Sequence, residues 1–316
     1  MENTAKLIAF GPVPSRRLGQ SLGINNIPPK NCTYSCVYCQ VGRAQKMITE
    51  RKEFYRTEEI VQQVEQKIFQ ARDKGETIDY LAFVPDGEPT LDINLGRVID
   101  RLKPLGIKIA VITNASLVWE KSVRDDLCRA DWVSLKTDAV SEDIWRKINR
   151  PHKSLKLENI LRGMLEFSDM FKGTLVTETM LVQGVNDSED EIKKIANFIF
   201  GLKVLKSYIS IPTRPPAEKE VKPSDENAIN MAYQFFIKKG IDTEYLIGYE
   251  GNAFAFTGDV RQDLLSITSV HPMKEEAVVE LLNKAKADRD IVESLILEGK
   301  LRRVCYRDQD FYVRKI

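Results

Sequence analysis

The sequence has no long apolar run and no excess of charge of either sign. No stretch of its 316 residues approaches the roughly twenty consecutive apolar residues of a membrane span. Lys and Arg number 47 against 46 Asp and Glu, which is a formal net charge of +1. Contact with nucleic acid would therefore depend on a local patch and not on a global basic field. We expect a protein that has no membrane partner.

Signals for secretion and for a disulfide framework are also lacking. The apolar run near the N-terminus is too short for a signal peptide and is interrupted by Pro12 and Pro14. The cysteines number five, and three of them, Cys32, Cys36 and Cys39, lie within one short segment. This distribution fits a metal or redox site in a reducing compartment better than a set of disulfides. We therefore expect a cytoplasmic protein.

Short β-branched segments alternate with segments of helical periodicity from about residue 20 to residue 250. With 43% apolar and 29% charged residues, the chain has the composition of one large domain, or of a large domain and a small one. The alternation is typical of repeated βα units around a parallel sheet. The predicted strands are Leu22–Asn25, Asp79–Phe83, Lys108–Thr113, Trp132–Lys136, Thr174–Val182, Lys206–Ile211 and Thr243–Ile247. The pattern predicts an α/β fold built as a partial or full (β/α) barrel, whose chemistry collects at the carboxyl ends of the strands.

Capping residues and glycines mark the predicted helix ends. One helix is predicted over residues 57–75, with acidic residues in its first turn and a glycine at its end. Ser188 and Glu191 are spaced as a capping box before a second helix, which is predicted to end at Gly201. A third helix is predicted over residues 224–240.

The pattern of the chain changes after Gly251. We predict a barrel domain over residues 1–250, a linker over 251–270 and a small winged-helix-like domain over 271–316. The predicted elements of this last domain are two helices and a hairpin, at Glu275–Asn283, Asp290–Leu297, and Leu301–Tyr306 with Phe311–Val313.

The three clustered cysteines follow the first predicted strand in a Cys-x₃-Cys-x₂-Cys pattern. Three thiolates can hold three irons of a cubane, whereas iron–sulfur clusters normally take four cysteine ligands, so one iron would stay open. A zinc site is the alternative, but it needs a fourth ligand at loop spacing. The other possible ligands lie far along the chain, at Cys128, Cys305, His152 and His271. The pattern therefore favours an iron–sulfur cluster.

This spacing, with the aromatic Tyr38 directly before the last cysteine, resembles that of the radical S-adenosylmethionine (SAM) superfamily. The resemblance implies one [4Fe–4S] cluster on Cys32, Cys36 and Cys39, with SAM chelated at the open iron through its amino and carboxylate groups. It also implies that Tyr38 lies near the adenine. In such enzymes an electron from an external donor of the flavodoxin or ferredoxin type cleaves SAM and yields a 5′-deoxyadenosyl radical. The protein supplies placement and excludes competing reactions.

The loop after the second predicted strand carries a second matching element. Its Asp86-Gly87-Glu88-Pro89 sequence resembles the Gly-Gly-Glu-Pro element of the superfamily, with Asp86 in place of the first glycine. The resemblance implies that Gly87 lets the backbone approach the methionyl ammonium and that Glu88 favours this cation. By itself Pro-Asp-Gly is typical of an ordinary turn. Its position after the strand that follows the cluster loop favours the cofactor site.

Polar residues mark the ends of later predicted strands. Asn114 follows the third strand, where the superfamily often has a residue directed at the ribose. Ser134 and Lys136 lie on the fourth strand and resemble ribose and carboxylate contacts. Each position is also compatible with a polar strand end that faces solvent. Arg214, on the proline-rich loop after the sixth strand, either holds an anionic substrate group or is solvated.

The segment Gly11–Gly19 precedes the first predicted strand and contains Arg16 and Arg17. Together with the Asp-Gly-Glu-Pro variant, it resembles the branch of iron–sulfur oxidoreductases related to the wyosine tRNA-modification enzymes. On this resemblance Arg16 and Arg17 are candidate substrate-binding residues. The wyosine enzymes carry a second cysteine-bound cluster, for which this chain lacks upstream cysteines. We therefore expect this chain to bind a single cluster and to carry out its reaction with that cluster alone.

These features predict a radical SAM enzyme that modifies an RNA base or a protein or peptide side chain, with RNA preferred. Basic residues outnumber acidic ones in the C-terminal hairpin region, which can therefore contact tRNA. The basic residues are Lys300, Arg302, Arg303, Arg307, Arg314 and Lys315, against Asp308 and Asp310. The preceding helix is acidic and would repel a phosphate backbone, so RNA binding, peptide binding and a structural role stay open for the module. The competing function is a non-catalytic iron–sulfur or zinc regulator that binds DNA through the winged helix.

Overall fold

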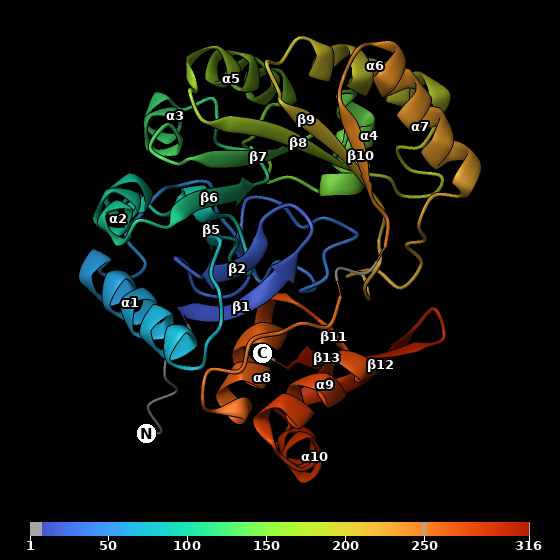
Figure 1. Cartoon of the computed structure of the whole chain (residues 1–316). Helices are drawn as coiled ribbons and strands as arrows, with labels where there is room; N and C mark the ends of the chain where they lie inside the picture. Colours follow the sequence, from blue (N-terminus) through green and yellow to red (C-terminus); the bar gives the residue numbers. More distant parts are fainter. Residues whose placement is uncertain (1–7, 249–250, 316) are drawn as a thin grey trace.

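The computed structural model describes residues 8–248 and 251–315. Its main sheet has eight strands, in the spatial order β1 (Ala9–Ser15), β2 (Gly19–Ile24), β5 (Tyr80–Phe83), β6 (Lys108–Thr113), β7 (Trp132–Lys136), β8 (Thr174–Met180), β9 (Lys206–Ser210) and β10 (Thr243–Leu246). Neighbouring strands from β2 to β10 are parallel, and β1 is antiparallel to β2. Because β1 and β10 lie at opposite edges, the sheet is a partial and not a full barrel (Figure 1).

The strands predicted from the sequence all occur, and β6 and β7 have the predicted bounds. β1 was not predicted, and its sequence contains Pro12 and Pro14. Proline has no N–H to donate and is confined within sheets to edge strands and bulges, and β1 is an edge strand. The expectation about the N-terminal segment rests in part on residues 1–7, which lie outside the described residues.

Helices connect the parallel strands and cover the outer face of the sheet (Figure 1). They are α1 (Thr57–Asp73), α2 (Leu95–Leu102), α3 (Lys121–Leu127), α4 (Glu142–Asn149), α5 (Leu157–Met170), α6 (Glu189–Phe200) and α7 (Glu226–Lys238), with 3₁₀ turns at Pro89–Leu91 and Lys103–Leu105. In α1 the buried Ile60, Val64 and Ile68 recur at the spacing of one helical face. Within the described ranges, no helix is long and apolar enough to cross a membrane.

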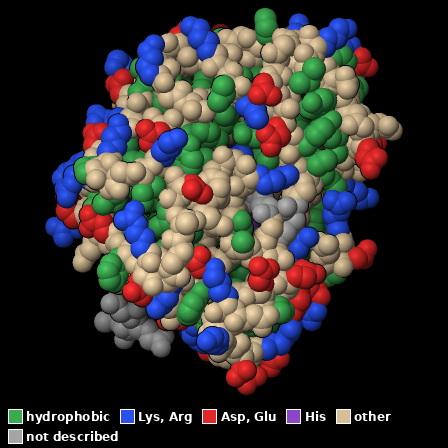
Figure 2. All heavy atoms as spheres, viewed as in Figure 1, with side chains coloured by type: hydrophobic (Ala, Val, Ile, Leu, Met, Phe, Trp, Pro, Cys, Tyr) green, Lys and Arg blue, Asp and Glu red, His purple; other side chains and the backbone are tan. Residues whose placement is uncertain are grey.

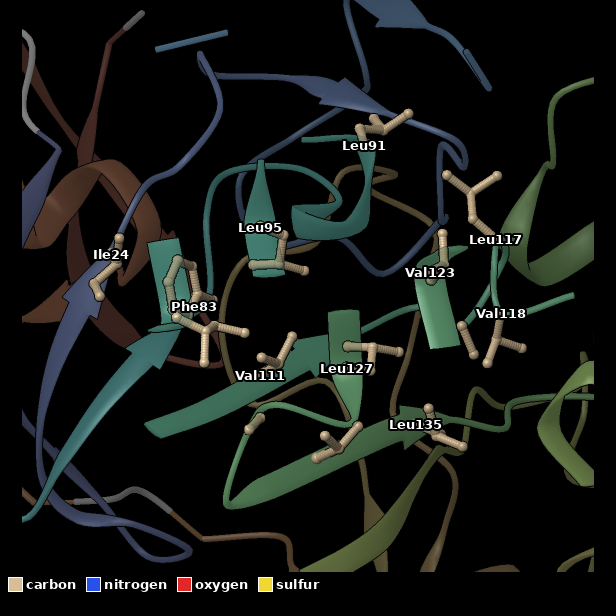
Figure 3. Packing of buried hydrophobic residues seen from close by; sticks show 14 of the residues in the cluster. Ile24, Phe83, Leu91, Leu95, Val111, Leu117, Val118, Val123, Leu127 and Leu135 are labelled. Carbon is tan, nitrogen blue, oxygen red and sulfur yellow. The ribbon is translucent and has the colours of Figure 1, made fainter. Parts of the chain in front are cut away.

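Both faces of the sheet are buried. Figure 3 shows Phe83, Val111 and Leu135 of neighbouring strands in one cluster with Leu95 of α2 and Leu127 of α3. Alternate side chains of a strand point to opposite faces, and on the concave face a second cluster includes Ala82, Ala110, Trp132, Val176 and Tyr208. The outer face therefore carries the helices, and the concave face supports the site described below.

The predicted capping box at the start of α6 forms only in part. The Ser188 hydroxyl accepts a hydrogen bond from the backbone N of Glu191 at 3.4 Å. The Glu191 carboxylate accepts instead from the backbone N of Val140 at 2.8 Å and of Ser141 at 3.0 Å. Glu191 therefore stabilises the N-terminus of α4, because Ser141 is the residue before that helix. This contact depends on the packing of two helices and not on local spacing.

The C-terminal residues form a module of helices and a small sheet. Its elements are α8 (Val260–Val270), β11 (Met273–Lys274), α9 (Glu275–Ala285), α10 (Asp290–Leu297), β12 (Leu301–Tyr306) and β13 (Gln309–Arg314). The strands are antiparallel in the order β11-β13-β12. The predicted helices and hairpin are present, and the winged-helix assignment and the domain boundaries stay predictions. The segment 251–270, expected to be a linker, contains α8, whose Leu264 and Ile267 are fully buried.

α8 joins the C-terminal module to the barrel. Phe10 and Val13 of β1 share a hydrophobic cluster with residues of the module, which lies beneath β1 in Figure 1. Lys67 of α1 forms a buried ion pair with Asp263 of α8, with Nζ 2.8 Å from Oδ1. Thr257 donates to the same carboxylate from its backbone N at 2.8 Å and its Oγ1 at 2.6 Å. Removal of either charge would leave the other buried without its counter-charge.

Acidic and basic side chains are interspersed over the face of the molecule shown in Figure 2. This distribution agrees with the formal net charge of +1. No broad surface of one charge is therefore visible on this face.

We expect Asp263→Ala to lower the free energy of unfolding by about 3–5 kcal/mol, because Lys67 would keep a buried charge without its partner. Urea denaturation followed by circular dichroism measures the change. Asp125→Ala is the control, since Asp125 pairs with Lys121 on the exposed side of α3 and such a pair contributes less than about 1 kcal/mol. Equal losses in the two variants would contradict this account of the junction.

Candidate active site

A cavity of about 310 Å³ opens at the carboxyl ends of the parallel strands. This volume is at the lower end of the range of roughly 300–1,000 Å³ for small-molecule sites. Its wall includes the predicted site residues Cys32, Cys36, Cys39, Tyr38, Gly87, Glu88, Asn114, Lys136, Arg16, Arg17 and Arg214. Ser134 is the exception, because it is fully buried within β7 and does not line the cavity. Its position does not favour the predicted ribose contact.

The three cysteines lie on the loop that begins at β3 (Asn31–Cys32), which pairs with β4 (Lys46–Met47). Burial and then the charge of Asp138 raise the pKa of Cys36 to about 11. Burial and then the charge of Cys36 raise the pKa of Cys39 to about 12 and raise that of Cys32 as well. Raised pKa values favour the neutral thiols, and a bound metal centre would deprotonate them as its ligands. The donor set therefore fits an iron–sulfur cluster.

No group of three His, Cys, Asp or Glu side chains in the described part of the chain forms a site for a single metal ion. Three thiolates on a cubane would instead bind three different irons. The zinc alternative therefore has no preformed site among these residues.

Two asparagine amides from outside the loop donate to the cysteine sulfurs. Asn114 Nδ2 lies 3.5 Å from the Cys32 sulfur and 2.8 Å from Thr33 Oγ1. Asn149 Nδ2, at the end of α4, lies 3.4 Å from the Cys36 sulfur. Donors of this kind orient the ligands of a cluster and tune its potential. The ribose contact expected of Asn114 stays a prediction, and Asn149 was not found from the sequence.

Tyr38 contacts an acid through its hydroxyl group and a base through its ring. Its hydroxyl donates to the carboxylate of Asp138, which also accepts from Asn149 Nδ2 at 2.9 Å. Lys136 Nζ lies 5.1 Å from the centre of the Tyr38 ring, a cation–π distance. The aromatic residue before Cys39 is therefore fixed in the cavity wall, and its contact with adenine stays a prediction.

Gly87 allows the strand-end loop to lie directly against the cluster loop. A Cβ atom at this position would be 2.0 Å from the backbone oxygen of Asn31, and the φ angle of Gly87 is +151°. Asn31 and Gly87 form an isolated parallel bridge. Any side chain at Gly87 would therefore push apart the two loops that carry the predicted cofactor residues.

Glu88 is almost completely buried, with 1% of its surface exposed. Its Oε1 accepts from Thr90 N at 3.0 Å, from Thr90 Oγ1 at 2.6 Å and from Thr113 Oγ1 at 2.6 Å. Its Oε2 accepts from Asn114 N at 2.8 Å. Burial raises the pKa of Glu88, and these donors act in the opposite direction. Glu88 therefore ties together the ends of β5 and β6, a role that its motif alone did not indicate.

A buried ion-pair network lies on the concave wall. Lys136 Nζ is 3.0 Å from Glu178 Oε1, and Arg17 pairs with the same carboxylate. Ser210 Oγ donates to Glu178 Oε1 at 3.1 Å. Burial would raise the pKa of Glu178, but Lys136 and Arg17 hold it at about 2. The sequence did not identify this pairing, because it depends on the β7–β8 register that sets Lys136 beside Glu178.

The C-terminal module borders the mouth of the cavity. Arg214 Nη2 lies 2.8 Å from His271 Nε2, and Arg214 Nη1 donates to Gln40 Oε1 at 3.2 Å. Gln40 Nε2 donates to the backbone oxygen of Val270 at 2.9 Å. At the other side of the mouth, Arg16 Nη1 donates to the oxygen of Tyr245 at 3.4 Å. Arg214 is therefore part of a contact between the cluster loop and the module, and is not simply solvated.

Residues 26–199 of the chain match the family model of the radical SAM superfamily. The matched range is more than half of the chain and includes the cysteine loop, Gly87, Glu88 and Lys136. The chain therefore belongs to the radical SAM superfamily and is an enzyme of that superfamily.

Within the superfamily the chain belongs with the UPF0026 proteins. It is 50% identical over 311 residues to the UPF0026 protein MJ1312 of Methanocaldococcus jannaschii, and the match covers 98% of this chain and 96% of that protein. A more distant relative is the probable dual-specificity RNA methyltransferase RlmN of Streptococcus sanguinis. It is 23% identical over 216 residues, which are 66% of this chain and 58% of that protein.

Solved structures share the partial barrel. A radical SAM methyltransferase from Sphaerobacter thermophilus superposes with a TM-score of 0.56 and 18% identity, over 72% of this chain and 66% of that chain. TYW1 with a lysine-pyruvate adduct bound gives a TM-score of 0.54 and 17% identity, over 69% of this chain and 73% of that chain. At these identities the similarity concerns the fold. The predicted resemblance to the superfamily and its wyosine-enzyme branch is confirmed at that level.

We expect Gly87→Ala to impair cluster loading, because the added Cβ would collide with the backbone oxygen of Asn31. Iron and sulfide content after anaerobic reconstitution should fall below about half of the wild-type value, since the loop contact holds the ligands in place. Gly184→Ala is the control, because Gly184 also has a positive φ but no atom within 4 Å of its added Cβ. Normal loading of Gly87→Ala would show that the two loops can separate without loss of the site.

Proposed function

We propose that the chain binds one [4Fe–4S] cluster through Cys32, Cys36 and Cys39 and binds SAM at the open iron. When bound and reduced, these groups supply a 5′-deoxyadenosyl radical that abstracts hydrogen from an RNA base or a protein side chain, with RNA preferred. The observation that carries the proposal is that the three buried thiols share one cavity with Gly87, Glu88 and the ends of β6 and β7. The cofactors themselves are those of the superfamily to which the chain belongs.

The residues of this chain position the reactants and exclude water. Asn114 and Asn149 orient the sulfurs of Cys32 and Cys36 through their amide N–H groups. Apolar side chains complete the cavity wall above the polar network, at Val84, Ile112, Met180, Ile211 and Leu246. A wall of this kind limits water near a reactive intermediate and so prevents side reactions.

Basic residues outnumber acidic ones in the wall of the cavity. The basic residues are Arg16, Arg17, Lys30, Lys136 and Arg214, and the acidic ones are Asp86, Glu88 and Glu178. Such an excess inside a cleft concentrates anions. The cavity therefore favours an anionic substrate, and nucleic acid is the macromolecule with the densest negative charge.

The C-terminal module supplies a second surface for such a substrate. Tyr306, at the end of β12, donates its hydroxyl to the backbone oxygen of Pro212 at 3.1 Å. The hairpin is thereby held beside the loop that leads to Arg214. Arg302 and Arg303 on this hairpin are exposed and can contact phosphate groups. The RNA methyltransferase among the relatives also supports RNA as the substrate class.

A protein or peptide substrate is the second candidate. The acidic helix α10 would repel a phosphate backbone, and it carries Asp290 and Glu293 in its first turn. The non-catalytic regulator considered from the sequence is disfavoured, because the chain belongs to a superfamily of enzymes. For the electron we propose an external donor of the flavodoxin or ferredoxin type in the cytoplasm.

Anaerobic reconstitution with iron and sulfide, followed by dithionite and SAM, is expected to yield 5′-deoxyadenosine, measured by liquid chromatography. Cys36→Ala should reduce the yield to background, because a cluster lacking one of its three ligands is not held in place. Cys305→Ala should leave the yield unchanged, since Cys305 is exposed on β12 away from the cavity wall. A wild-type protein that takes up about four irons per chain and never forms the nucleoside would contradict the proposal.

Filter binding to tRNA across a salt series tests the preference for RNA. Replacing both Arg302 and Arg303 by Ala should reduce the salt slope by about two, because each phosphate contact contributes roughly 0.9 to the slope. Arg97 and Arg101 are the matched control pair, since both are basic residues on α2 that pair with Glu58. An unchanged slope in the hairpin variant would favour a protein substrate or a structural role for the module.

A further inference from the structure

A second cavity, of about 240 Å³, lies between the barrel and the C-terminal module. Its wall combines residues from the loops after β9 and β10 with residues of the module's three-stranded sheet, and they are Thr213, Ile247, Lys274, Tyr306, Arg307 and Gln309. Thr213 also lines the main cavity, which contains the cysteines. Ile247 lies between Leu246 and Gly248, which line the main cavity as well. A molecule that enters the main cavity can therefore extend directly into the second one.

The wall of the second cavity differs chemically from that of the main cavity. Lys274 and Arg307 supply two positive charges. Thr213 and Gln309 supply a hydroxyl group and an amide group, both of which can donate hydrogen bonds. In the described part of the chain, no acidic residue belongs to this wall, whereas acids do line the main cavity. Cations and neutral donors without a carboxylate suit an anion, and a phosphate group accepts hydrogen bonds from all of these groups.

The turn that carries Arg307 has a long side chain where glycine or asparagine is favoured. Arg307 and Asp308 form the two-residue loop between the paired residues Tyr306 and Gln309, and their φ angles are +52° and +58°. Asn-Gly and Asp-Gly are typical of such a turn, because both of its central residues need a positive φ. Aspartate tolerates this region better than arginine does. Backbone strain of this kind clusters at functional sites, so the Arg307 side chain is a candidate for a function that offsets the strain.

The sheet of the module holds both cations at the second cavity. The Tyr306 hydroxyl donates to the backbone oxygen of Pro212 at 3.1 Å, and the Tyr306 ring meets the ring of Phe311 edge-on, with centroids 6.4 Å apart. Lys274 of β11 is the register partner of Phe311. Burial raises the pKa of Tyr306 and the charge of Arg307 acts in the opposite direction, which agrees with a position of this charge near the tyrosine. Arg307 and Lys274 are therefore presented by one sheet that is anchored to the barrel.

We propose that the second cavity binds a phosphodiester group of the RNA substrate, next to the nucleotide that enters the main cavity. The inference rests on the proposed function, because it requires RNA as the substrate. Arg307 and Lys274 neutralise the phosphate charge. Thr213 and Gln309 donate hydrogen bonds to the phosphate oxygens. Phosphate contacts fix the register of a nucleic acid without reading its bases, so these positioning residues set which nucleotide of a bound strand reaches the main cavity.

Filter binding of total tRNA to the anaerobically reconstituted full chain, across a salt series, tests this assignment. Arg307→Gly should raise the Kd about tenfold, because a charge-assisted contact is lost, and should reduce the salt slope by about one. Lys274→Gln should give the same pattern. Arg307→Gly should also keep or raise the melting temperature, because glycine adopts a positive φ without strain. A residue that served only the structure of the turn would not lose tRNA binding while stability was kept.

Lys286→Gly is the matched control for Arg307→Gly. Lys286 is likewise an exposed basic residue of the module with a positive φ, of +52°, but it lines neither cavity. This variant should therefore bind tRNA as the wild type does. An equal loss of tRNA binding in Lys286→Gly and Arg307→Gly would overturn the assignment, because a general charge effect would then explain both.

Unchanged tRNA binding in Arg307→Gly would also overturn the assignment. Calorimetry with inorganic phosphate distinguishes a second source of the same chemistry. Saturable phosphate binding that Arg307→Gly abolishes, with tRNA binding unchanged, would assign the cavity to free phosphate and not to RNA. A wild-type protein that does not bind tRNA would instead contradict the RNA preference of the proposed function, so the two failures are distinguishable.

Discussion

Parallel pairing of the strands from β2 to β10 is the constraint on which the site depends. Because these strands run in one direction, the loops that follow β5, β6, β7 and β8 leave the sheet at the same edge. The register between neighbouring strands then determines which side chains lie side by side. The register of β7 and β8 places Lys136 beside Glu178. A shift of one residue would turn each side chain to the opposite face of the sheet. The bridge between Asn31 and Gly87 extends the same constraint to the cysteine loop, whose position is thereby tied to the sheet.

Most charged groups at the base of the cavity are satisfied by other protein groups. Glu178 is neutralised by Lys136 and Arg17, and Asp138 accepts from Tyr38 and Asn149. A polar network that is satisfied in this way holds its members in one arrangement in a medium of low polarity. The cysteine sulfurs and the Asp86 carboxylate are different, because their burial is not balanced by enough donors or cations. These buried groups, which lack enough donors or cations of the protein, therefore indicate which kind of ligand the cavity binds.

The C-terminal module is part of the site and not an appendage to the barrel. α8 is anchored by the buried pair of Lys67 and Asp263, and its last residue, Val270, lines the cavity. Gln40, directly after the last cluster cysteine, donates to the backbone of Val270. A macromolecule bound on the module would therefore lie next to the cluster loop. This proximity is the physical reason to expect that the module takes part in choosing the substrate.

Features that depend on contiguous residues could be predicted from the sequence. They include the bounds of β6 and β7, the helices α1, α6, α7, α9 and α10, the cysteine loop and the Gly87–Glu88 motif, because periodicity and ligand spacing are local properties. The tertiary structure alone decided contacts between distant residues. It placed Asn149 on the sulfur of Cys36, and it buried Ser134 away from the cavity wall. It also brought three residues to the Glu88 carboxylate as donors and left Asp86 Oδ2 without one among the described residues, because donors reach a buried carboxylate only through the packing of neighbouring strands and loops.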